Sequence, residues 1–170
     1  MTPDHTAPDT RYSVASTLLE NVPYALMILL GVAALLLSLY PGRATWGVGG
    51  GYLAYGLLGP LWIILFLCPH CPSFGKRSCP CGYGVLSARL RRPGDTSRFG
   101  AEFKRHIGVI VPLWLIPPIV AGVTLARGFS WPLAVVLGVF VLNSYVLLPL
   151  RSKLRGCKHC GQRAQCPWAR

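Results

Sequence analysis

Four long stretches without any charged residue constrain this chain more than any other feature. They comprise residues 22–40, 46–67, 107–126 and 131–150. A helix rises about 1.5 Å per residue, so each stretch can cross a hydrocarbon core that is about 30 Å thick. Because uninterrupted apolar runs are not barrel strands, they favour helices. We therefore predict an all-α integral membrane protein, a four-transmembrane-helix bundle with a cysteine-rich cytoplasmic loop and C-terminal tail.

Composition agrees with membrane insertion and narrows the classes of partner. Hydrophobic residues make up 52% of the 170 residues and charged residues only 13%, against about 25% charged residues in typical soluble domains. The net charge of +12 would suit nucleic-acid binding. However, the basic residues crowd beside the apolar stretches, where lipid phosphates are the nearer anions. We therefore exclude nucleic acid and expect the bilayer and its anionic lipids as partners.

Lys and Arg are distributed very unevenly among the segments that connect the apolar stretches. Eight lie in the loop 68–106, six in the tail 151–170 and one in the N-terminal segment 1–21. The two remaining loops hold one each, Arg43 and Arg127. By the positive-inside rule, both termini and the long loop are predicted to be cytoplasmic, in a multi-pass protein of the inner (plasma) membrane. Segment 1–21 is polar and lacks the features of a signal peptide, so we expect a flexible tail.

The membrane domain 22–150 has further internal signals. Gly47 and Gly51 stand four residues apart in the second stretch, a spacing that favours close packing of helix backbones. The third stretch contains Pro117 and Pro118, so we expect neighbours to satisfy the carbonyls that lack a helical donor. None of the four stretches holds an ionisable Asp, Glu, Lys, Arg or His, which argues against a carboxylate-driven pump and a membrane-buried bis-histidine haem. In the loop, two short helices are expected around the Pro93–Gly94 break.

Seven cysteines form two groups, each behind an apolar stretch. The first, C-x2-C-x7-C-x-C, comprises Cys68, Cys71, Cys79 and Cys81; the second, C-x2-C-x5-C, comprises Cys157, Cys160 and Cys166. Because the second and fourth helices run in the same direction, both groups are expected on the cytoplasmic face. Paired C-x2-C turns on a reducing face favour a metal over a disulfide. The sequence therefore predicts that both groups build one site.

The identity of the metal is open at this point. Zinc requires four ligands, which could be Cys68, Cys71, Cys157 and Cys160. An iron–sulfur cluster also takes four thiolates, and four of the cysteines precede a proline, as at ferredoxin ligands. We favour an iron–sulfur cluster that takes part in electron transfer, with zinc as the alternative. The predicted ligands are Cys68, Cys71, Cys79, Cys157, Cys160 and Cys166, with Cys81, His70 and His159 as possible additional ligands.

Two other functions remain open. The metal could be a structural zinc clasp in an accessory subunit of a larger membrane complex. Alternatively, the chain could be a quinone-linked thiol/disulfide oxidoreductase. In span number, length and one C-x2-C it is similar to the bacterial quinone-linked membrane proteins that make disulfides and to the vitamin K epoxide reductases. Those proteins act largely on the outer face, whereas the charge distribution here places every cysteine inside, so we assign neither family. No catalytic acid, base or nucleophile besides cysteine is identified, so whether the chain is an enzyme stays open.

Overall fold

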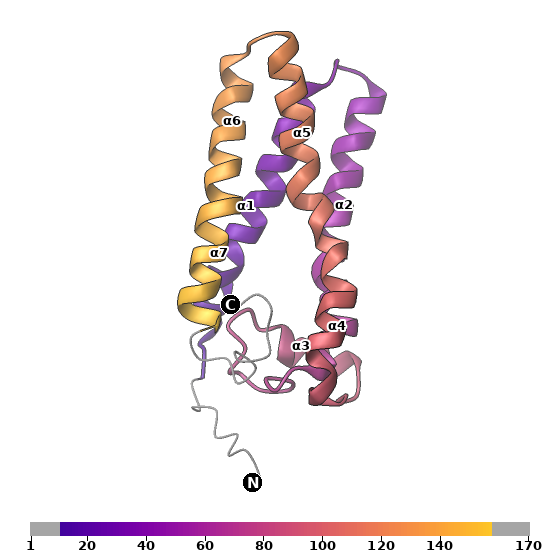
Figure 1. The fold of residues 1–170 in the computed structure, drawn as a ribbon, viewed down its shortest axis with the longest axis vertical. Helices are drawn as coiled ribbons and strands as arrows, with labels where there is room; N and C mark the ends of the chain where they lie inside the picture. The colour runs from indigo at the N-terminus through magenta and orange to yellow at the C-terminus, as the bar shows by residue number, and fades with distance from the viewer. Residues whose placement is uncertain (1–10, 158–170) are drawn as a thin grey trace. The chain divides into compact units, whose positions relative to one another are not determined.

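The structure is a computed structural model that describes residues 11–157. Within that range it contains helices and turns and no strand, as predicted (Figure 1). The α-helices are α1 (Val14–Ser38), α2 (Arg43–Phe66), α3 (Tyr83–Leu90), α4 (Phe99–His106), α5 (Val111–Arg127), α6 (Trp131–Val141) and α7 (Leu148–Arg151). Short 3-10 segments are η1 (Cys68–His70), η2 (Thr96–Arg98) and η3 (Ile107–Ile110), and π-helical turns are η4 (Leu142–Leu147) and η5 (Ser152–Cys157).

Four helical stretches of the described chain are long and apolar enough to cross a membrane. They are Val14–Ser38, Arg43–His70, Thr96–Arg127 and Trp131–Arg155, each longer than the corresponding predicted stretch. At the N-terminal side, α1 begins at Val14, within the segment 1–21 that we expected to be a tail. The helix can extend because two polar residues in this region, Glu20 and Asn21, have hydrogen-bonding partners. The finding is compatible with a multi-pass membrane protein.

The chain divides into two compact units. We call Val22–Pro60 with Gly108–Pro149 the bundle unit, and Met1–Asn21 with Leu61–Ile107 and Leu150–Arg170 the loop unit. In the bundle unit, the core gathers side chains from four helical segments, with Met27, Tyr52, Leu113 and Phe140 among its buried members. Phe140, Met27 and Leu113 are completely buried. Burial of such side chains stabilises the packing of the bundle unit through dispersion contacts.

Three tyrosine hydroxyls in the bundle unit each bond a backbone carbonyl that proline deprives of its helical donor. Proline has no N–H, so the carbonyl four residues before it loses its partner. The hydroxyl of Tyr24 donates to Gly56 O at 2.9 Å, four residues before Pro60. The remaining two bonds run from Tyr52 to Leu113 O and from Tyr145 to Trp114 O, both at 2.7 Å, four residues before Pro117 and Pro118. These contacts confirm that neighbouring helices satisfy the freed carbonyls.

Glycines allow close approach in the bundle unit, but not at the positions we predicted. A Cβ at Gly31 would lie 2.5 Å from the Tyr52 hydroxyl, and one at Gly56 would lie 2.6 Å from the Ile28 side chain. A Cβ at Gly47 or Gly51 would meet nothing within 4 Å among the described residues. The prediction of tight packing at Gly47 and Gly51 is therefore wrong. Small residues four apart permit packing, but they do not determine which face of the helix is covered.

The loop unit contains the two short helices expected around Pro93–Gly94, α3 and α4. The buried Ser87 hydroxyl donates to Ile64 O at 2.7 Å, which attaches α3 to the end of α2. Asp95 precedes η2 and its carboxylate accepts from Ser97 N at 2.9 Å, a typical N-cap. Phe99 packs with Leu67 in a small apolar cluster. The loop following α2 is thus anchored at both ends to folded helix.

Candidate metal centre

The first cysteine group lies in a chain of tight turns that begins where α2 ends. Cys68 opens η1, and Cys71 N donates back to Cys68 O at 3.0 Å. Phe74 N donates to Cys71 O at 2.9 Å, and Gly82 N donates to Cys79 O at 3.1 Å. Each of these turns closes on a cysteine carbonyl. The backbone of Cys68, Cys71 and Cys79 is therefore held in folded turns.

Glycine is required where this loop turns back on itself. Gly75 and Gly82 have φ of 71° and 75°, values that residues with a Cβ rarely adopt. Gly75 N also donates to Gly84 O at 3.0 Å, which closes the loop. A Cβ at Gly84 would collide with Ser73 O. Larger residues at these positions would open the segment that carries the first cysteine group.

The thiols of the loop are partly to fully shielded from water. Cys68 is buried, with 8% of its surface exposed, while Cys71, Cys79 and Cys81 are half-buried. None of these four cysteines forms a disulfide within the described residues. Burial, with smaller contributions from the neighbouring Cys79 and Glu20, raises the pKa of Cys81 to about 12. Among the residues that the structure describes, no three or more His, Cys, Asp or Glu side chains gather closely enough to hold a metal ion.

Tyr12 connects the cysteine loop to the end of the C-terminal helix. Its backbone N–H donates to Arg77 O at 3.0 Å, inside the loop. Its hydroxyl donates to Arg155 O at 3.5 Å, a long hydrogen bond that indicates proximity more than strength. Burial raises the pKa of the Tyr12 phenol, Glu20, Cys79 and Cys81 add to the rise, and Arg155 opposes it. Arg155, Cys79 and Cys81 are therefore all within electrostatic range of one hydroxyl.

Glu20 makes a second connection between the same segments. Its carboxylate Oε1 accepts from Arg155 Nη1 at 2.9 Å and from Arg151 Nη2 at 3.3 Å. The Glu20 side chain is only 6% exposed, whereas Arg151 and Arg155 are 38% and 56% exposed. The adjacent Asn21 donates its amide to Cys81 O at 3.1 Å. We call Tyr12, Glu20 and Asn21 the N-terminal bridge, because they contact both the loop and the C-terminal helix.

The structure describes only some of the predicted metal ligands. Cys157 is the last residue of η5 and follows Arg155 by two positions. Cys160, Cys166 and His159 lie outside the described residues. Whether the two groups share an ion thus stays a prediction, but the backbone that leads to Cys157 ends beside the bridge.

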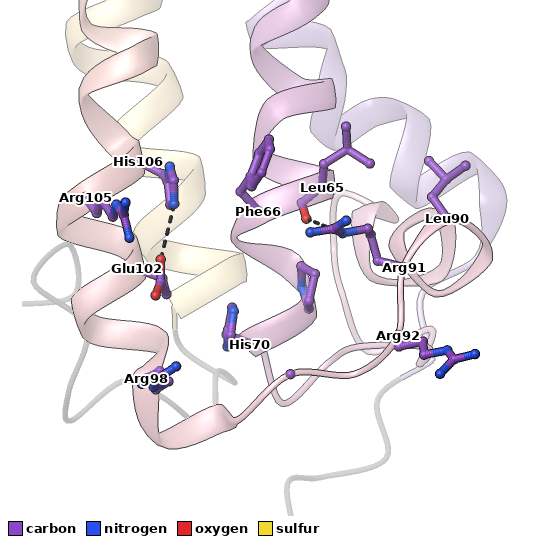
Figure 2. Close-up of a pocket in the computed structure, with 12 residues that line it drawn as sticks. Leu65, Phe66, His70, Leu90, Arg91, Arg92, Arg98, Glu102, Arg105 and His106 are labelled. Carbon is purple, nitrogen blue, oxygen red and sulfur yellow. Dashed lines mark hydrogen bonds and ion pairs between the residues drawn. The ribbon is translucent and has the colours of Figure 1, made fainter.

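The surroundings of His70 differ from those expected for a metal ligand. Its Nδ1 lies 3.0 Å from Asp95 O, and its ring packs against Gly94, where an added Cβ would lie 2.7 Å away. It lines a pocket among arginines, at the centre of Figure 2. Only Nε2 of His70 would remain available to a metal.

Sequence reasoning did not identify the N-terminal bridge. The chain has only five acidic residues, and Glu20 is the one directly beside an apolar stretch. A carboxylate at that position is costly unless it is paired. Its isolation was therefore a readable signal that a basic partner lies nearby, although it could not reveal which of 17 Lys and Arg residues supplies it.

Comparison with known proteins adds no family to these observations. Protein-family models, curated proteins and solved structures give no significant match to this chain.

Proposed function

We propose that this chain is a membrane electron-transfer protein that carries one cysteine-ligated metal centre, an iron–sulfur cluster, on its cytoplasmic face. The centre is shared by the loop and the C-terminal tail. Its ligands are drawn from Cys68, Cys71, Cys79, Cys157, Cys160 and Cys166. Possible additional ligands are Cys81, His70 and His159. A soluble donor would pass electrons through this centre to quinone or to a larger membrane complex.

The observation that carries the proposal is the position of the N-terminal bridge. Tyr12 contacts Arg77 of the loop through its N–H and Arg155 of the C-terminal helix through its hydroxyl. The loop and the C-terminal helix are thus both in contact with one residue, Tyr12. Cys157 follows Arg155 by only two residues, so its backbone begins within a short reach of the first group.

The charge distribution supports a cytoplasmic position for this centre. Lys and Arg number 15 in the loop, tail and N-terminal segment, against Arg43 and Arg127 in the two opposite loops. By the positive-inside rule, both termini would lie in the cytoplasm of the inner membrane. Basic residues around the cysteines would also offset the negative charge of several thiolates.

Burial of Cys68 and Cys81 argues against these two thiols as nucleophiles in thiol–disulfide chemistry without a metal. The attacking species in such chemistry is the thiolate, and efficient nucleophiles have a pKa near or below neutrality. The pKa of Cys81 is about 12 because burial disfavours the thiolate. A metal ion overcomes this cost, since it binds the thiolate directly and displaces the proton.

The four cysteine–proline pairs, which resemble ferredoxin ligand positions, favour iron–sulfur over zinc.

Metal analysis of the anaerobically purified full-length chain, together with its visible spectrum, tests the proposal. We expect a brown protein with iron and acid-labile sulfide in comparable amounts and broad visible absorption that bleaches on reduction. A colourless protein with about one zinc per chain would replace the redox role with a structural clasp. A preparation with neither iron nor zinc would refute the metal centre and leave the thiols themselves as the functional groups.

A further inference from the structure

The loop unit contains a pocket that none of the described cysteines lines. Its volume is about 700 Å³, within the range of roughly 300–1,000 Å³ that is typical of small-molecule sites. It lies at the cytoplasmic end expected for α2 and is formed by the segments that follow this helix. Its charged lining consists of Arg91, Arg92, Arg98, Arg105 and Glu102.

The arrangement of the arginines leaves their charge available to a ligand. In Figure 2, Arg98 and Arg105 lie on one side of the pocket and Arg91 lies on the other, with Phe66 and His70 between them. Arg98 and Arg105 are seven residues apart, and Arg105 lies on α4. Neither makes an ion pair within 4 Å among the described residues.

Arg91 is oriented by the chain rather than by an acid. Its Nε donates to Leu65 O at 3.2 Å, and its guanidinium carbon lies 5.7 Å from the centre of the Phe66 ring. The ring favours the cation above its face. Neither terminal amino group of Arg91 donates a hydrogen bond to another described residue. Both can therefore take part in the two-pronged contact that guanidinium makes with phosphate.

The single acid in the pocket is already engaged. The Trp62 indole N–H donates to His106 Nδ1 at 3.2 Å, so Nδ1 is an acceptor and the ring proton lies on Nε2. That proton points to Glu102 Oε2, 3.2 Å away. Glu102 thus accepts from Nε2–H of His106, and among the described residues it makes no ion pair within 4 Å with an arginine of the pocket. The pocket carries an excess of positive charge.

The remaining lining is apolar, which narrows the class of ligand. Leu65, Phe66, Pro69 and Leu90 form this part of the wall, and Phe66 ends the apolar helix α2. A ligand with an anionic head and an apolar body would satisfy both parts. Basic pockets at the cytoplasmic ends of membrane helices commonly hold phosphate head groups.

We propose that this pocket binds the phosphate group of a phosphate-bearing ligand, held by Arg91, Arg98 and Arg105. The phosphate can belong to an anionic phospholipid or to a soluble phosphate compound, since both present the same oxygens to the guanidinium groups. The proposal does not depend on the metal centre, because none of the cysteines that the structure describes lines the pocket.

Native mass spectrometry of the full chain in detergent tests the proposal with three probes: phosphatidic acid, phosphatidylcholine and inorganic pyrophosphate. We expect phosphatidic acid to be retained in preference to phosphatidylcholine. Replacement of Arg98 and Arg105 by Gln should weaken this retention by about tenfold or more, because charge-assisted hydrogen bonds are lost. The matched control replaces Arg89 and Lys104 by Gln; both are exposed, lie on α3 and α4, and do not line the pocket.

The outcomes separate the sources of the phosphate. Selective retention of phosphatidic acid identifies a lipid head group, whereas selective binding of pyrophosphate identifies a soluble phosphate compound. Binding of neither probe, or an equal loss in the control variant, would overturn the proposal. A second variant, Arg98→Lys with Arg105→Lys, preserves charge and protects against a folding artefact. It should still weaken binding several-fold, because lysine cannot make the paired contact, and unchanged binding would contradict the arginine site.

Discussion

Replacement of Glu20 by Gln is expected to weaken the attachment of the C-terminal helix to α1 and to accelerate metal loss from the proposed centre. The Glu20 carboxylate is nearly buried and bonds both Arg151 and Arg155. Gln keeps the shape but removes the charge, so two guanidiniums lose their partner. We expect these contacts to lose about 2 kcal/mol of stabilising free energy. This is less than for a fully buried pair, because both arginines are partly exposed. The rate at which a chelator removes metal from the purified protein should rise by about tenfold or more.

Glu102→Gln is the matched control for this experiment. Glu102 is also in the loop unit and also pairs with a nitrogen base, His106, at 3.2 Å. However, it contacts neither the cysteine loop nor the C-terminal helix in the described structure. Metal loss in this variant should match the unmodified protein. Equal acceleration in both variants would mean that the Glu20 contacts do not hold the centre together.

Tyr52→Phe is expected to destabilise the bundle unit by about 1–3 kcal/mol. The lost hydroxyl donates to Leu113 O at 2.7 Å, and no helical N–H can replace it because Pro117 stands four residues later. A carbonyl without a donor is costly where water is excluded. Unfolding of the purified protein in a mixed-micelle denaturant series measures the difference.

A double substitution separates this explanation from loss of packing. Pro117→Ala restores an N–H that can bond Leu113 O, so Tyr52→Phe should cost far less in the Pro117→Ala background. Tyr55→Phe serves as a control, since its hydroxyl contacts Val109 O, and position 113, four residues later, is not proline. If Tyr52→Phe costs the same with and without Pro117, the hydroxyl does not substitute for the missing helical donor.

The fold was predictable from the sequence because each apolar stretch is long enough to span a bilayer and has few alternatives. Helix ends were harder, since a window that stops at the first charged or polar residue cuts α1 short at position 22, whereas the helix begins at Val14. Glu20 is tolerated there through Arg151 and Arg155, more than 130 residues away. Such a partnership depends on tertiary structure and has no local signature.

The sequence predicted the two cysteine groups of the candidate site, but it did not predict the contacts that join distant segments around them. The spacing of the cysteines identified the two groups, and the turns around Cys68 and Cys71 follow from the C-x2-C pattern. The Tyr12 contact joins segments that only the folded chain brings together. The pocket was hidden for a similar reason, because Arg91, Arg98 and Arg105 come from separate short segments whose mutual orientation depends on the turn at Gly94.

The most direct test of one shared centre is the metal content of chains that lack a cysteine from either group. Cys68→Ser, Cys157→Ser and the double variant should each lose at least about nine-tenths of the bound metal, and the double variant should be no worse than either single one, because one site is destroyed once. Ser78→Ala, a change in the same loop, should keep full metal content. Retention of metal by Cys157→Ser, with loss confined to Cys68→Ser, would contradict a centre shared by both segments.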